Sequence, residues 1–253
     1  MALLRTVRAT RYATPLREGG SLPAIVEADD LGMYVVKFRG AGQGPAALVA
    51  ELIGGEIARL LGLPMPEIVF VDVDAALGRN EPDPEIRDLL KASVGLNLAL
   101  DYLPGSVMFD PAARESVDAD LASRIVWLDA FLLNIDRTPQ NPNLLLWHRE
   151  LYLIDHGAAL YFQHRWESAP QAALSRFPQS KDHVLLPWAD RLSQADEALR
   201  PLLSEEAVTN VVAAVPQEWL TAEPAAYVDI LLRRLEAAPA FTEEAQRARA
   251  QLV

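Results

Sequence analysis

The feature that most constrains this chain is a polar loop, residues 134–143, enclosed by apolar segments. Apolar runs flank the loop on both sides, beginning with Leu128–Leu133, so buried elements are expected before and after it. The loop carries Asp136 and Asn141, and a second acid, Asp155, ends the apolar stretch that follows. Polar groups in such a setting are costly unless they bind something. The pattern therefore favours a functional site over a loop whose Asx side chains only cap its own turns.

An acid, an amide and a second acid in this order suit phosphoryl transfer. A carboxylate beside the acceptor hydroxyl orients it and takes its proton, while carboxylate and amide oxygens bind the Mg²⁺ that accompanies a triphosphate. Kinases place a catalytic Asp and a metal-binding Asn at this spacing, and a second Asp in an Asp-x-Gly turn. Asp136 is therefore predicted as the catalytic residue, and Asn141 and Asp155 as metal ligands. The expected cofactors are ATP and Mg²⁺.

A lysine in the first third of the chain supplies the cation that this chemistry needs. Lys37 lies in the apolar run Met33–Phe38, where a lysine is costly unless it is paired; the alternative is an edge-strand lysine that reaches solvent. We expect it to bind phosphates and to pair with an acid on the next predicted helix, Ala46–Leu61. Glu51 begins the apolar part of that helix, whereas Glu56 lies closer to the centre of its apolar face. Periodicity alone favours Glu56.

The order of the expected elements indicates an α+β protein with a two-lobed, protein-kinase-like fold. Strands are predicted in the first part at Leu22–Asp30, Gly32–Phe38, Glu67–Asp74 and Leu96–Leu103, around the helix Ala46–Leu61. A helix at Leu121–Asn134, a hairpin of Asn143–Trp147 and Leu151–Ile154, and a helical pattern from Ser168 onward follow. The predicted division is a small sheet-rich N-lobe, residues 1–97, on the nucleotide-phosphate side, and a helical C-lobe, residues 98–253, with the catalytic loop and the metal site.

Charge and composition exclude several classes of function. The net charge is −12, from 35 acidic and 23 basic side chains, and no basic cluster appears, so nucleic acid is not an expected partner. Arg5, Arg8, Arg11 and Arg17 are spaced along the chain and predict a solvated strand edge. No apolar run approaches the roughly 18 to 20 residues that span a bilayer, and no signal peptide is apparent. The absence of cysteine fits a cytoplasmic location.

With these residues in place, the chain resembles the HipA-type kinases, particularly a shorter branch of HipA-like proteins within the protein-kinase and phosphoinositide-kinase superfamily. The matching stretches are Tyr34-Val-Val-Lys37-Phe, Ala50-Glu51 with Leu-Gly-Leu-Pro at 61–64, Asn134-Ile-Asp136-Arg-x-x-x-Asn141, and Ile154-Asp155-His156-Gly157. The resemblance implies ATP and Mg²⁺ and the same roles for Asp136, Asn141 and Asp155. It also selects Glu51 as the partner of Lys37, against the periodicity argument.

The resemblance extends to nucleotide contacts. The usual glycine-rich phosphate loop is reduced here to Gly19-Gly20-Ser21, whose amides and Ser21 hydroxyl are expected to contact phosphate. By analogy, Asp101, Tyr102 and Leu103 would bind adenine through backbone groups, the alternative being a simple strand end. The chain departs from the family inside the catalytic loop, at residues 138–140, which leaves the substrate and the rate open.

The expected activity is that of a kinase acting on an alcohol, with a Ser or Thr hydroxyl of a protein as acceptor. A small-molecule kinase and a pseudokinase that serves as a binding module stay open as alternatives. Neither a nucleic acid nor a membrane is expected as a partner. The family resemblance leaves room for an antitoxin-like or regulatory protein partner.

The four histidines are too scattered for a zinc site. His156 lies inside the predicted metal turn. His148, His164 and His183 are predicted to have surface or capping roles.

Overall fold

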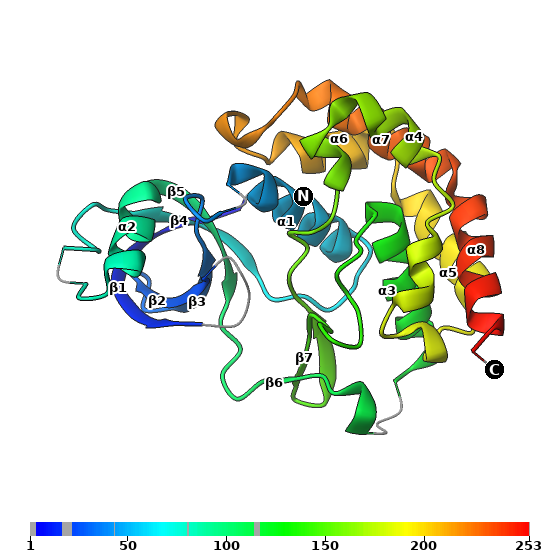
Figure 1. The fold of residues 1–253 in the computed structure, drawn as a ribbon, viewed down its shortest axis with the longest axis horizontal. Helices are drawn as coiled ribbons and strands as arrows, with labels where there is room; N and C mark the ends of the chain where they lie inside the picture. The colour runs from blue at the N-terminus through cyan, green and yellow to red at the C-terminus, as the bar shows by residue number, and fades with distance from the viewer. Residues whose placement is uncertain (1–3, 17–21, 43, 80, 114–116, 253) are drawn as a thin grey trace.

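The computed structural model describes residues 4–16, 22–42, 44–79, 81–113 and 117–252. A sheet-rich region comes first and helices follow, with the barrel at one end of the molecule in Figure 1 and most of the helices at the other. The strands are β1 (Thr6–Pro15), β2 (Ala24–Ala28), β3 (Met33–Lys37), β4 (Ile68–Val73), β5 (Gly95–Asp101), β6 (Val107–Met108), β7 (Leu144–Trp147) and β8 (Glu150–Leu153). The α-helices are α1 (Pro45–Leu60), α2 (Pro84–Ala92), α3 (Ala119–Leu132), α4 (Ala169–Ala173), α5 (Leu192–Leu199), α6 (Glu205–Ala213), α7 (Pro224–Glu236) and α8 (Ala238–Ala250).

Strands β1 to β5 close into a barrel in the order β1-β2-β3-β5-β4. All neighbouring pairs are antiparallel except β1 and β4, which run parallel over a short register in which Val7 faces Val71. The division predicted between residues 97 and 98 falls inside β5, which pairs with both β3 and β4. β5 therefore belongs to the barrel along its whole length.

Alternating side chains fill the barrel, as a strand with one buried face requires. Val26, Val36, Val69 and Val71 are fully buried inside it. β1 alternates only at its start, where Arg8 is exposed between the buried Val7 and Ala9; Arg11 is exposed as well. The arginines are solvated as predicted, but β1 pairs with both β2 and β4 and is not an edge strand.

Helix α1 joins the barrel to the helical region. It begins at Pro45, after Gly44 at φ 63°, and the chain turns away at Gly62, whose φ is 70°. Its residues are buried almost all round, because it contacts β4 and β5 on one side and α6 on the other. Figure 1 shows α1 between the barrel, beside which α2 lies, and the helices α3 to α8.

A three-stranded sheet has the order β6-β7-β8; the polar loop leads from α3 into β7, and a turn follows β8. α3 ends at Leu132, and the next residue, Leu133, adopts a left-handed conformation at φ 56° that directs the chain into the loop. Among the helices described, none combines the length and the apolar composition needed to cross a membrane.

Candidate active site

Three segments bring one lysine and two acids together. Lys37 ends β3, Glu51 lies in α1 and Asp155 follows β8. The Nζ atom of Lys37 donates to Oε2 of Glu51 at 2.7 Å and to Oδ1 of Asp155 at 2.6 Å. The Glu51 side chain is fully buried and that of Lys37 is 15% exposed, so the cation is nearly enclosed between the two carboxylates.

The charges of this group depend on one another. Burial would lower the pKa of Lys37, but the carboxylates of Asp155 and Glu51 raise it to about 12. The Lys37 cation in turn lowers the pKa of Asp155 to about 2. Burial raises the pKa of Glu51, and the same cation acts against that rise. Lys37 and Asp155 are therefore both charged at neutral pH.

The pairing of Lys37 with Glu51 decides between the two acids of α1. Glu56 is also buried, but its Oε1 atom accepts from Arg59 at 2.7 Å on the same helix. The periodicity argument for Glu56 was wrong because α1 is covered on nearly every side, so the centre of an apolar face does not locate the site.

The turn at residues 154–157 packs directly on α1. The backbone amide of His156 donates to Oε2 of Glu51 at 2.7 Å. A Cβ atom built on Gly54 would lie 2.7 Å from Cβ of His156, so only glycine permits this approach. Asp155 adopts a left-handed conformation at φ 58°, and such strain persists where the surroundings fix it.

The polar loop gathers around Asp136. Its Oδ2 atom accepts from Nδ2 of Asn141 at 2.9 Å and from Nδ2 of Asn143 at 3.3 Å. The amide nitrogen of Asn141 is used in this hydrogen bond. Its side-chain oxygen therefore stays available as a ligand for a hard metal ion. The described part of the chain holds no group of three or more His, Asp or Glu side chains that could bind a metal.

A buried network beneath the loop was not predicted. Asp129 of α3 is fully buried; its carboxylate accepts from Asn134 at 2.8 Å, Arg137 at 2.6 Å and His183 at 2.9 Å. Burial would raise the pKa of Asp129, but the Arg137 cation and the His183 hydrogen bond lower it overall. The sequence feature that could have indicated this network is an acid, Asp129, inside the apolar predicted helix Leu121–Asn134.

His183, predicted to have a surface or capping role, does not lie at the surface. It is buried, and its Nδ1 atom accepts from the backbone amide of Leu185 at 3.0 Å. Burial lowers its pKa, so the imidazole is neutral and the proton on Nε2 is donated to Asp129. His148 and His164 are exposed.

The segment expected to contact adenine begins with Asp101, the last residue of β5. The amides of Asp101 and Tyr102 donate to backbone oxygens of Glu67 and Met33, at 2.8 and 3.0 Å. Among the described residues no group accepts the amide hydrogen of Leu103. Ser21, the predicted phosphate contact, lies outside the described residues.

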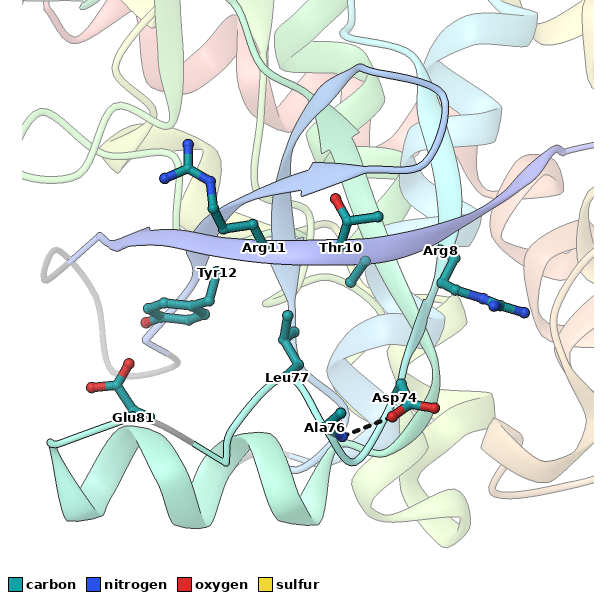
Figure 2. Close-up of a pocket in the computed structure, with 9 residues that line it drawn as sticks. Arg8, Thr10, Arg11, Tyr12, Asp74, Ala76, Leu77 and Glu81 are labelled. Carbon is teal, nitrogen blue, oxygen red and sulfur yellow. Dashed lines mark hydrogen bonds between the residues drawn. The ribbon is translucent and has the colours of Figure 1, made fainter.

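A cavity of about 420 Å³ lies elsewhere, between β1 and the connection from β4 to α2. Figure 2 shows Arg8, Thr10 and Tyr12 on one side of it and Asp74, Leu77 and Glu81 on the other. None of the predicted site residues lines this cavity, so it is separate from the candidate active site.

Comparison with known proteins gives a consistent result. Residues 10–244 match the sequence profile of a family described as HipA-like kinase. The structure resembles a proinflammatory kinase, CtkA, of Helicobacter pylori, with a TM-score of 0.59 and 13% identity over 98% of this chain and 99% of that one. It also resembles the Golgi casein kinase solved with Mn/ADP bound, with a TM-score of 0.50 and 11% identity over 96% of this chain and 74% of that one. No curated protein sequence matches this chain.

Proposed function

The chain belongs to the HipA-like kinase family, and from that premise we propose that it transfers the γ-phosphoryl group of ATP to a hydroxyl group with the help of Mg²⁺. The observation that carries the proposal is the position of Lys37, 2.7 Å from Glu51 and 2.6 Å from Asp155. A lysine paired with a helix glutamate beside a metal-binding aspartate is the arrangement that kinases use around the phosphates.

Each residue has a distinct role in this proposal. Asp136 accepts the proton of the acceptor hydroxyl and orients its oxygen, while Asn141 keeps the Asp136 carboxylate in place through their 2.9 Å hydrogen bond. Lys37, oriented by Glu51, neutralises phosphate charge. Asn141 and Asp155 offer the oxygen atoms that would bind Mg²⁺, which supplies charge neutralisation at the transferred group when bound. The solved Golgi casein kinase with Mn/ADP supports the use of a nucleotide and a divalent metal.

Nucleotide binding between two lobes extends the proposal. The barrel acts as the N-lobe and the helical region as the C-lobe, and adenine contacts the backbone near Leu103, whose amide lacks an acceptor among the described residues. A phosphate contact from Ser21, which lies outside the described residues, is also part of the proposal. The proposed acceptor is a Ser or Thr hydroxyl of a protein. The proposed location of the kinase itself is the cytoplasm.

The direct test is phosphate release from ATP in the presence of Mg²⁺, together with the intact mass of the protein and of added acceptors. Wild type is expected to turn over ATP, and Asp136→Ala and Asp155→Ala are expected to lose activity by about 10² to 10⁴-fold. Asp88→Ala, at an exposed position of α2, is the control and should behave as wild type. A wild type that neither binds nor consumes ATP under varied metal conditions would contradict the proposal and favour a binding module on the same fold.

A further inference from the structure

We infer that Asp129, Arg137 and His183 form a positioning relay that sets the catalytic loop and the metal turn relative to each other, an inference that rests on the proposed function. The relay touches none of the reacting groups. It is built from three segments that are distant in the sequence: the last turn of α3, the polar loop and the chain just after the 3-10 helix Pro178–Asp182.

The guanidinium group of Arg137 bridges the two halves of the site. It donates to the backbone oxygen of Asn143 at the end of the catalytic loop, and to that of Ile154 at 3.2 Å, directly before Asp155. The Nη2 atom of Arg137 also lies 3.3 Å from Nε2 of His156. Since arginine only donates, His156 accepts there, and one side chain thus fixes both the loop with Asp136 and the turn with Asp155.

Asp129 sets the position of that guanidinium. Its Oδ2 atom accepts from Nε of Arg137 at 2.6 Å, and both side chains are fully buried. Its Oδ1 atom accepts from Nδ2 of Asn134, whose own side-chain oxygen accepts from the amide of Asp136 at 3.2 Å. One carboxylate therefore controls the arginine and, through one intermediate, the backbone of the proposed catalytic residue.

His183 is the part of the relay that can be altered most selectively. It donates from Nε2 to Asp129 at 2.9 Å, and the next residue, Val184, donates its amide to the backbone oxygen of Arg137 at 3.0 Å. Residues 183 and 184 are therefore hydrogen-bonded to both members of the ion pair, Asp129 and Arg137. His183 is not a metal ligand or a reacting group in the proposed chemistry. Its substitution therefore changes none of the proposed catalytic residues.

A pair of near-isosteric variants isolates the donor function. Glutamine can place an N–H near the position of Nε2 and so keep the hydrogen bond to Asp129. Asparagine is too short for that, but it can keep an acceptor near the position of Nδ1 for the amide of Leu185. His183→Asn is therefore expected to lower kcat by about 10- to 100-fold with little change in KM for ATP, and His183→Gln is expected to restore most of kcat.

Two controls separate positioning from general loss of stability. Val212→Ala removes buried methyl groups from α6 and lowers stability without contact with the relay, and each variant is assayed below its own melting temperature. Hydrogen exchange is measured in parallel on the peptides that cover residues 134–143 and 154–157. In His183→Asn both peptides should exchange faster together, whereas Val212→Ala should leave their relative protection unchanged.

The outcomes are distinguishable. Equal kcat in His183→Asn and wild type, equal losses in the Asn and Gln variants, or unchanged exchange of the two peptides would overturn the relay. An inactive wild type would refute the proposed function, and the exchange measurement would then decide on its own whether the two segments are coupled through Asp129 and Arg137.

Discussion

Lys37 is a nearly enclosed cation held between two carboxylates, one from α1 and one from the turn after β8. A lysine within an apolar strand needs a partner, and the structure supplies two, Glu51 and Asp155. The sequence could indicate that a pair exists, but the choice between Glu51 and Glu56 depends on which side of α1 faces β3. That orientation follows from packing on both faces of the helix, which periodicity does not record.

The two acids of α1 give a matched test at the residue scale. Both are buried and each pairs with a base at 2.7 Å, but only Glu51 contacts Lys37. Glu51→Gln is expected to lower kcat/KM for ATP by roughly tenfold or more, because the lysine loses its orienting charge. Glu56→Gln should keep near-wild-type kinetics. Similar losses in both variants would show that α1 matters only through its stability.

The buried neutral His183 predicts a pH dependence of stability. The folded state keeps its pKa below the ordinary 6.5, with Asp129 and Arg137 as the charged groups that face it. As the pH falls below that value, the unfolded chain binds a proton that the folded one does not, so stability falls by up to about 1.4 kcal/mol per pH unit. Urea unfolding at pH 7 and pH 5 should therefore show a smaller acid loss in His183→Gln than in wild type. Equal losses would contradict a neutral buried imidazole.

At the scale of elements, strong local patterns predicted most of what surrounds the site. β2 to β5, α1, α3 and the β7–β8 hairpin all lie where the sequence indicated, with ends shifted by a few residues. α2 was not predicted, although Asp83 caps it by accepting from the amide of Glu85 and Pro84 begins it. Only Ile86 and Leu90 of this helix are buried, so its sequence lacks the repeated apolar spacing by which a helix is recognised.

Helix α1 and the metal turn give a test at the element scale. In Gly54→Ala the new methyl group would meet Cβ of His156 at 2.7 Å, and overpacking of about 1–3 kcal/mol should exceed the gain of about 1 kcal/mol in helix propensity. Activity should fall because the turn beside Asp155 moves. In Gly55→Ala the nearest atoms are side-chain ends of Ile68 and Met65, which can shift, so activity should persist. Thermal melts and ATP turnover of both variants check this, and an active Gly54→Ala would contradict the close approach.

For the whole molecule, the order of elements predicted a sheet-rich region followed by helices, but not how the sheet closes. The barrel is completed by the parallel pairing of β1 with β4, between residues more than 60 positions apart, as Thr6 and Phe70 show. No local pattern records such a pairing. The relay around Asp129 was hidden for the same reason, since His183 reaches it from 54 residues away.

The barrel and the helical region are expected to unfold together. Ile68 of β4 and Leu98 of β5 belong to the same buried cluster as α1 and the later helices, and Phe70 packs edge to face on Trp219 at 5.7 Å. All tryptophans lie beyond residue 98, so their fluorescence reports on the helical region and, through Trp219, on its contact with β4. Hydrogen exchange of β2 and β3 reports on the barrel. The two probes should share one urea midpoint. Separate midpoints would show that the barrel is an independent unit.

The central claim is that the group around Lys37 is a phosphotransfer site, and one measurement tests it most directly. It is the rate at which the γ-phosphoryl group of labelled ATP is consumed with Mg²⁺ by wild type, Lys37→Met and Lys91→Met, the last being an exposed lysine of α2. Wild type and Lys91→Met are expected to have similar rates, and Lys37→Met is expected to lose about 100-fold or more. A Lys37→Met variant that consumes ATP at the wild-type rate would contradict it.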